Sequence, residues 1–179
     1  LTHSRRGAGV FVKARPTDYP LGRRVRFHQN LAASGRTASR RTLLLDTRRA
    51  DPAEAEALRL DPGAAVHVYE GLSFADGLPI GLFRSVFEAA RFPGLLAALA
   101  ETQSVTAALA REGLADYTRA TTRLTAKIAR GTRAALLQLP EGAPLLRSEA
   151  LNIDPAGQPV ESGITWFAGD RVTLTVAPE

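Results

Sequence analysis

The chain has 179 residues, of which 45% are apolar and 23% charged, the composition of an ordinary globular domain that can bury a hydrophobic core. It has no cysteine and only three histidines, far apart in the sequence, which excludes disulfides, thiolate catalysis and the common zinc-binding patterns. No apolar run approaches the roughly 20 residues of a membrane-spanning helix. We therefore expect no metal and no cofactor, and the lack of cysteine fits a reducing compartment such as the cytoplasm.

The net charge of +5 is concentrated at the start of the chain. Residues 1–27 hold seven Lys and Arg against one Asp, whereas residues 28–179 hold sixteen against seventeen Asp and Glu. A basic terminal segment on a nearly neutral body is typical of a protein that contacts a polyanion. Compositional drift is the alternative, because only two of the cations are Lys and alanine is abundant.

The first third of the chain predicts short elements separated by breakers. Residues 4–12, SRRGAGVFV, predict a glycine turn that leads into a short strand. Residues 13–22 contain two prolines and a glycine and predict a linker. Residues 24–33 predict a helix that ends at Ser34-Gly35, and residues 39–48 predict a strand.

The remaining segments predict strands and helices joined by short turns. An Asp-Pro pair at residues 51–52 starts a helix, and Asp76-Gly77 is the turn of a hairpin over residues 66–88. Further helices are expected at residues 91–100, 104–113 and 131–139, further strands at residues 117–129 and 170–177, and a second hairpin at residues 144–167. Neighbouring strands joined by short turns predict an α+β domain, with an antiparallel sheet and helices packed on one side.

Several polar residues in apolar surroundings are candidates for binding a small anion. Ser104 opens a helix, followed by Thr106 in the first turn, which is consistent with an anion site or with a simple N-cap. Arg84 and Arg147 lie in largely apolar strands and point either into a pocket or into solvent. Glu161 is a possible acceptor for a ligand hydroxyl or amine, or an exposed edge-strand acid.

Catalytic motifs are absent from the sequence. We find no nucleotide-binding loop, no G-x-S-x-G nucleophile elbow and no paired acids, and so predict no catalytic residue.

The order of several short segments resembles a known family of transcription regulators. SRRGAGVFV resembles the end of the winged helix-turn-helix of GntR-type regulators, in which a basic, glycine-rich wing ends in a G-x-G-x-F-V strand. The part after this segment resembles the UTRA effector-binding domain of the HutC branch, and most of all that of regulators of phosphonate-utilisation operons. The whole resemblance spans residues 4–176. The matching segments are RFHQNLAASG, GLSFADGLPI, FPGLLAAL, SVTAAL, LLQLPEGAPLLRSEALNIDPAGQPVESG and FAGDRV.

The resemblance implies a chorismate lyase-like α+β fold with a six-stranded antiparallel sheet, and a homodimer. It divides the chain into the tail of a winged helix (1–12), a linker (13–22) and the UTRA domain (23–179). The recognition helix that reads DNA would precede the first residue. The residues that fall in the DNA-contacting wing are Arg5, Arg6, Gly7 and Gly9.

Family members that sense sugar phosphates suggest part of the ligand site. They bind phosphate through a Ser and a Tyr at a helix start, which correspond here to Ser104 and Thr106. They also use two arginines on the strand before the Asp-Gly turn, and this chain has Gly71 and Ser73 there, so the arginine pair is missing. The acid that contacts the sugar corresponds to Glu161.

Other parts of the family pattern point to further candidates. An aromatic residue six positions after the acid corresponds to Phe167, which lacks the hydroxyl of a Tyr. Residues at the start of the first helix also line the pocket, which implies Arg26 and His28. With the arginine pair missing, a small anion would take its positive charge from elsewhere, and Arg26, Arg84 and Arg147 are the candidates.

We therefore expect the effector-sensing domain of a GntR/HutC-type repressor. Its partners would be a small anionic metabolite, a phosphonate or a phosphate ester, and operator DNA bound through the N-terminal domain. Two other hypotheses remain: a lyase-like enzyme on the same fold that acts on an aromatic carboxylate, and a standalone small-molecule binding module without a role at DNA.

Overall fold

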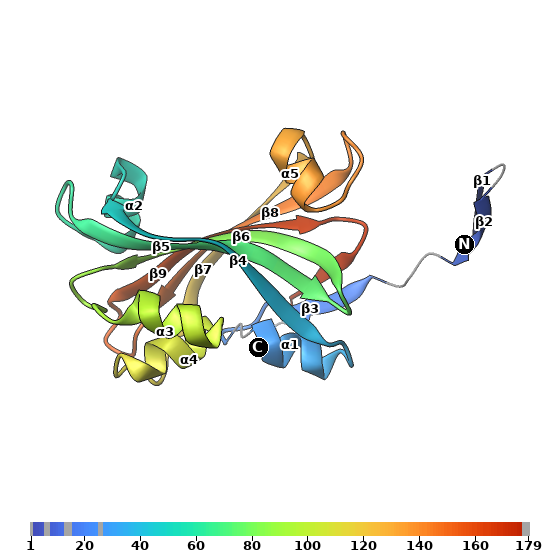
Figure 1. The fold of residues 1–179 in the computed structure, drawn as a ribbon. Coiled ribbons are helices and arrows are strands. Elements are labelled where there is room, and N and C mark those ends of the chain that lie inside the picture. The colour runs from blue at the N-terminus through green and yellow to red at the C-terminus, as the bar shows by residue number, and fades with distance from the viewer. Residues whose placement is uncertain (1, 6–7, 13–15, 25–26, 177–179) are drawn as a thin grey trace.

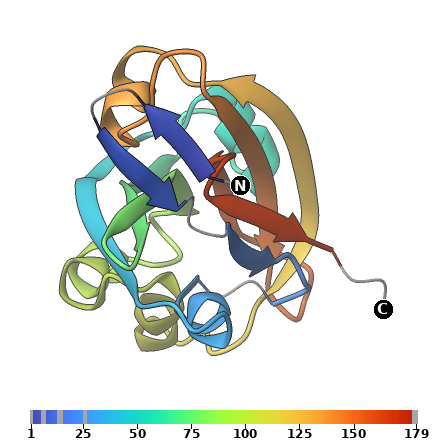
Figure 2. The ribbon, with the colours of Figure 1, turned by 90° about the vertical axis from the view of Figure 1, so that its right-hand side faces the viewer.

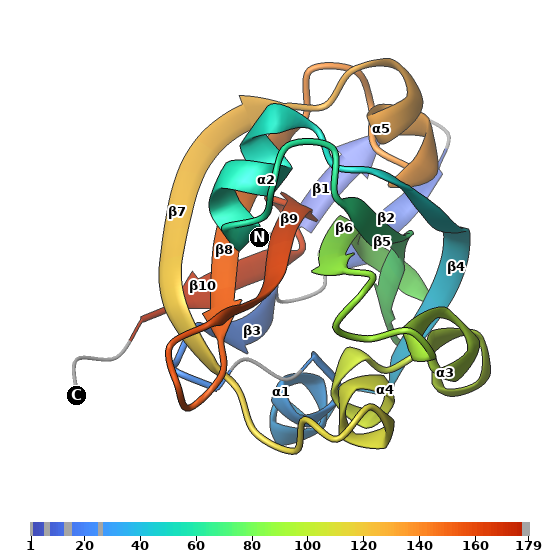
Figure 3. The same cartoon turned by 90° about the vertical axis from the view of Figure 1, so that its left-hand side faces the viewer.

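A six-stranded sheet forms the centre of the protein in the computed structural model, which describes residues 2–5, 8–12, 16–24 and 27–176 (Figure 1). Its strands are β4 (Ala38–Arg49), β5 (Ala65–Ala75), β6 (Leu78–Glu88), β7 (Thr118–Ile128), β8 (Pro144–Ile153) and β9 (Pro159–Ala168). The strand order is β4-β5-β6-β9-β8-β7, and every neighbouring pair is antiparallel. The sheet curls, so that its edges β4 and β7 lie on opposite sides (Figure 3). The α+β class and the six-stranded antiparallel sheet are confirmed.

Helices pack on both faces of the sheet (Figure 1). The helices on one face are α1 (Phe27–Ala33), α3 (Leu95–Thr102) and α4 (Val105–Arg111), and those on the other are α2 (Pro52–Leu58) and α5 (Gly131–Leu136). The expectation of helices on one side thus holds for three of these helices. The central strands explain the difference, because β5 and β6 are buried at consecutive positions and not only at alternate ones. A sheet with two apolar faces needs cover on both.

Local signals in the sequence place the start of α2 and the turn between β5 and β6 correctly. At the start of α2, the side chain of Asp51 accepts a hydrogen bond from the Glu54 backbone N–H, and the Glu54 carboxylate accepts one from the Asp51 N–H. This reciprocal pair is a capping box. Asp76 and Gly77 both have positive φ, 50° and 77°, as the two-residue turn of a hairpin requires.

The wing-like segment forms an antiparallel hairpin of β1 (Thr2–Arg5) and β2 (Ala8–Val12). Its second strand confirms the strand predicted after the glycine turn. Arg5 lies in β1 and Gly9 in β2, whereas Arg6 and Gly7 lie outside the described residues.

The expected linker contains a strand. β3 (Thr17–Pro20) pairs in parallel with β10 (Val172–Thr175), and the two form a small sheet of their own (Figure 2). The linker prediction is therefore wrong at residues 17–20, and the predicted final strand lies outside the large sheet. Burial explains the strand: Thr17 and Tyr19 are each 5% exposed and alternate with exposed residues, and Tyr19 packs against Phe27 and Phe167.

Candidate functional site

A cavity of about 510 Å³ lies on the face of the sheet that carries α1 and α4. Every strand of the large sheet except β5 contributes to its lining, and β3 closes one side through Tyr19. Because side chains alternate along a strand, the residues on β6, β8 and β9 that face the cavity are two positions apart. Its volume is within the range of sites for small metabolites.

Four of the predicted ligand residues line this cavity: Ser104, Thr106, Glu161 and Phe167. The fold thus brings together the start of α4 and β9, which are more than 50 residues apart in the sequence. The Ser104 hydroxyl oxygen accepts a hydrogen bond from the Ala107 N–H at 3.3 Å, so it caps α4. That these four residues contact a ligand stays a prediction.

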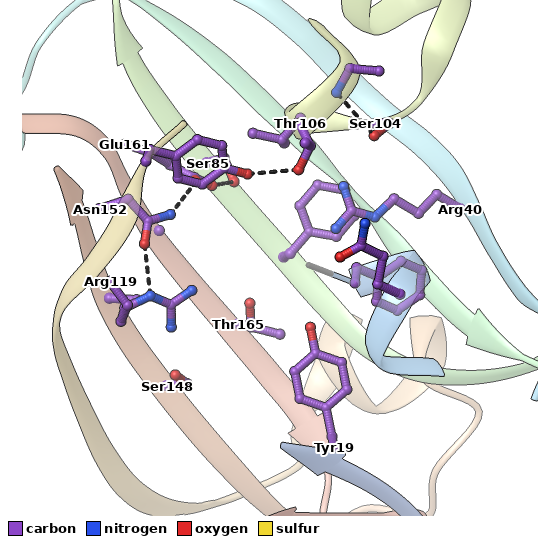
Figure 4. Close-up of a pocket in the computed structure, with 18 of the residues that line it drawn as sticks. Tyr19, Arg40, Ser85, Ser104, Thr106, Arg119, Ser148, Asn152, Glu161 and Thr165 are labelled. Atoms are coloured by element: carbon purple, nitrogen blue, oxygen red, sulfur yellow. Dashed lines mark hydrogen bonds between the residues drawn. The ribbon is translucent and has the colours of Figure 1, made fainter. Parts of the chain in front are cut away.

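A chain of hydrogen bonds crosses the wall formed by β6, β9, β8 and β7 (Figure 4). The Ser85 hydroxyl donates to Glu161 Oε1 at 2.5 Å, and Asn152 Nδ2 donates to Glu161 Oε2 at 2.6 Å. Arg119 Nε in turn donates to Asn152 Oδ1 at 2.8 Å. The amide of Asn152 therefore connects the guanidinium and the carboxylate, and fixes both against the sheet.

Two arginines that the sequence did not single out, Arg40 and Arg119, face the cavity. The guanidinium carbon of Arg40 lies 4.7 Å from the ring centre of Phe27 and 4.6 Å from that of Phe83. Within the described residues, neither arginine forms an ion pair with a carboxylate. The cavity therefore holds two positive charges whose carboxylate partners are absent from this part of the chain.

The cations proposed from the sequence lie elsewhere. Arg84 follows Phe83 in β6 and points to the opposite face, where its Nε lies 2.5 Å from Glu70 Oε1. Arg147 likewise points away from the cavity and pairs with Glu149 through two hydrogen bonds of 2.5 and 2.8 Å. The strand alternation thus excludes both from the cavity wall.

The other candidates from the sequence either do not line the cavity or lie outside the described residues. Ser73 lies opposite Arg40 in the register of β4 and β5, is 4% exposed, and does not line the cavity. Arg26 lies outside the described residues, and His28 lies in α1 with its side chain outside them.

The electrostatics of the cavity keep the Tyr19 phenol protonated. Burial raises the pKa of Tyr19, the charges of Arg40 and Arg119 and the side chain of Asn30 act in the opposite direction, and Glu161 raises it further. The neutral phenol can donate a hydrogen bond to an acceptor in the cavity.

Metal and membrane signatures are absent from the described part of the chain. No group of three or more His, Asp and Glu is placed there to hold a metal ion. In the same residues, no helix is long and apolar enough to cross a bilayer.

Known proteins similar to this chain are transcription regulators. The UTRA domain family matches residues 33–173. An HTH-type transcriptional regulator of Rhizobium meliloti is 33% identical over 177 residues, covering 98% of this chain and 72% of the relative. The HTH-type transcriptional repressor PhnF of Mycolicibacterium smegmatis is 28% identical over 171 residues, covering 96% and 69%.

Solved structures agree with this assignment. The crystal structure of PhnF from Mycobacterium smegmatis superposes with a TM-score of 0.83 at 27% identity, covering 98% of this chain and 77% of that one. The effector domain of the same protein superposes with a TM-score of 0.77 at 25% identity, covering 90% and 99%. Since the family match spans well over half of the residues and the relatives are transcription regulators, the chain belongs to the UTRA domain family and contains the effector-binding domain of a GntR-family transcription regulator.

Proposed function

We propose that the cavity binds a small anionic metabolite, a phosphonate or a phosphate ester, and that binding changes the affinity of an N-terminal winged helix for operator DNA. The observation that carries this proposal is the pair Arg40 and Arg119, which face one cavity without a carboxylate partner in the described residues. A partly desolvated cation is costly unless an anion compensates it. The planar guanidinium suits the oxygens of a phosphonate or phosphate.

The rest of the lining supports a polar ligand of this size. Hydroxyls of Ser148 and Thr165 lie beside Arg119 on the same wall, within reach of an oxyanion (Figure 4). Glu161 supplies the one carboxylate among the described lining residues, and its oxygens have acceptor capacity beyond the bonds from Ser85 and Asn152. A ligand hydroxyl or amine would bind to this carboxylate. We propose that Ser104 and Thr106, at the opposite wall, also contact the ligand.

The position of β3 supports a route from the cavity to DNA. Tyr19 lines the cavity and belongs to the strand that follows the wing-like hairpin. A ligand that prefers one arrangement of β3 shifts the population of the chain toward it. In a homodimer, which we also propose, this would change the spacing of two winged helices relative to the operator half-sites.

Thermal-shift measurements on the chain test the ligand class. Phosphonates, phosphate esters and small carboxylates are screened, and a ligand at a hundredfold excess over its Kd raises the Tm by roughly 5–10 °C. Arg119→Met is expected to lose most of this shift. The matched control Arg84→Met removes a guanidinium from the opposite face and is expected to keep it. Stabilisation by neutral compounds alone would contradict the proposal.

A further inference from the structure

Arg40 differs from the ion-paired arginines of the structure in what surrounds its guanidinium. Seven described arginines lie within 2.8 Å of a carboxylate oxygen: Arg24, Arg36, Arg48, Arg84, Arg91, Arg111 and Arg147. Arg40 instead lies against the rings of Phe27 and Phe83. Stacked rings contact the plane of a guanidinium and leave its N–H groups, which point outward in that plane, for another partner.

The hydrogen-bonding capacity of Arg40 is unused within the described residues. No side-chain hydrogen bond of Arg40 is formed there, and its Nε is buried without a partner. A buried donor without an acceptor costs free energy comparable to a lost hydrogen bond. Since Arg40 lines the cavity, an anion bound there is placed to accept from it.

Gly71 leaves space for the Phe83 ring beside Arg40. It lies opposite Phe83 in the register of β5 and β6. A Cβ at this position would lie 2.8 Å from Phe83 Cζ and 2.6 Å from the Arg41 carbonyl oxygen. The missing side chain therefore allows the Phe83 ring to lie over β5, where it contacts the guanidinium of Arg40.

We propose that Arg40 determines the specificity of the cavity for ligands that end in a planar or tetrahedral oxyanion group, and that Phe27, Phe83 and Gly71 hold its guanidinium in position. Two ligand oxygens accept hydrogen bonds from the N–H groups of Arg40, while the rest of the ligand extends toward Arg119 and Glu161. This inference rests on the proposed function, because it assigns one contact within the same cavity.

Calorimetric titration of the 179-residue chain with methylphosphonate, inorganic phosphate and acetate tests the assignment. Arg40→Met keeps a long side chain that packs on the rings but removes the charge. We expect it to bind methylphosphonate roughly ten- to a hundredfold more weakly than the wild type. Arg40→Lys keeps the charge without the planar fork and is expected to restore only part of the affinity.

Arg41→Met is the matched control. Arg41 is the next residue of β4, is exposed, and lies 5.8 Å from the ring centre of Phe74, which packs against the core cluster of the opposite face. Its variant is expected to bind like the wild type. Gly71→Ala provides a second route to the same contact, since its Cβ would displace the Phe83 ring and the Arg41 carbonyl next to Arg40, which weakens anion binding while the Arg40 side chain is kept.

The outcomes separate this inference from the proposed function. If Arg40→Met and Gly71→Ala bind the anions as tightly as the wild type while Arg119→Met does not, the assignment to Arg40 is overturned and the proposed function stands. If the wild type binds none of the three anions and no phosphonate or phosphate ester raises its Tm, both are overturned.

Discussion

His67 is a buried titratable side chain outside the cavity. It lies in β5, is 7% exposed, and its Nδ1 lies 2.8 Å from Thr47 Oγ1. Burial lowers the pKa of His67 below its ordinary value, although the backbone of Phe92 and the negative charge of Glu112 act to raise it. The imidazole is therefore neutral in the folded protein at pH 7.

This residue predicts a loss of stability in mild acid. In the unfolded chain a histidine binds a proton near pH 6.5, whereas folded His67 does so only at lower pH. Between these two pH values the unfolded state binds more protons, so stability falls as the pH falls. Between pH 7.5 and pH 5.5, the free energy of unfolding measured with urea is expected to fall by up to about 1.4 kcal/mol more in the wild type than in His67→Gln. The same pH dependence in both proteins would contradict the prediction.

The sequence identifies some cavity residues and misses others for a structural reason. Ser104 and Glu161 lie in recognisable local patterns, and both line the cavity. Arg40 and Arg119 do not stand out, because a cation on a strand is assigned to a face only when the register is known. The ladder shifts between Thr42 and Leu44 in β4, and directly after Arg119 in β7. Such bulges break the two-residue alternation from which a face is predicted.

At the scale of elements, α4 couples helix stability to the lining of the cavity. Ser104 caps the helix through the Ala107 N–H and also lines the cavity, so the two interpretations of this residue are compatible. Next to it, Thr106 Oγ1 lies 2.8 Å from Tyr117 OH, which connects α4 to the segment before β7. A substitution at the cap therefore has two separable consequences.

Two substitutions of Ser104 are expected to separate these consequences. Ser104→Ala removes the cap and lowers the free energy of unfolding by about 1 kcal/mol. Ser104→Asp keeps a capping oxygen, so its stability is expected within a few tenths of a kcal/mol of the wild type, but it adds a negative charge to the cavity wall. Chemical unfolding and titration with methylphosphonate measure both effects. Anion binding by Ser104→Asp equal to that of the wild type would place the anion away from α4.

Elements with local signals were predicted, and the element that depends on a distant partner was not. The α2 capping box and the Asp76-Gly77 turn involve residues at most three apart, so the sequence determines them directly. β3 exists because it pairs with β10, some 155 residues later, and because Tyr19 is buried. No turn joins two parallel strands this far apart, so residues 13–22 contain no local sequence signal that predicts the pairing.

At the scale of the whole molecule, one strand connects three parts of the chain. β3 follows the N-terminal hairpin, pairs with the C-terminal strand β10, and presents Tyr19 to the cavity. The phenol also packs against Phe27 of α1 and Phe167 of β9. Under the proposed function, a ligand that accepts a hydrogen bond from Tyr19 would act on the strand that follows the N-terminal hairpin.

This connection predicts a reciprocal linkage in a protein that carries its winged helix. If the effector changes operator affinity by some factor, operator DNA changes effector affinity by the same factor, typically between 5- and 150-fold. Tyr19→Phe keeps the ring packing and removes the hydroxyl, so it is expected to leave operator affinity without effector unchanged and to reduce this factor. Asp18→Asn, on the exposed side of the same strand, is the control and keeps it. Operator binding measured with and without effector gives this factor for each variant. An unchanged factor in Tyr19→Phe would mean that the conformational change is transmitted from the cavity through α4 or α1, since these elements also line it.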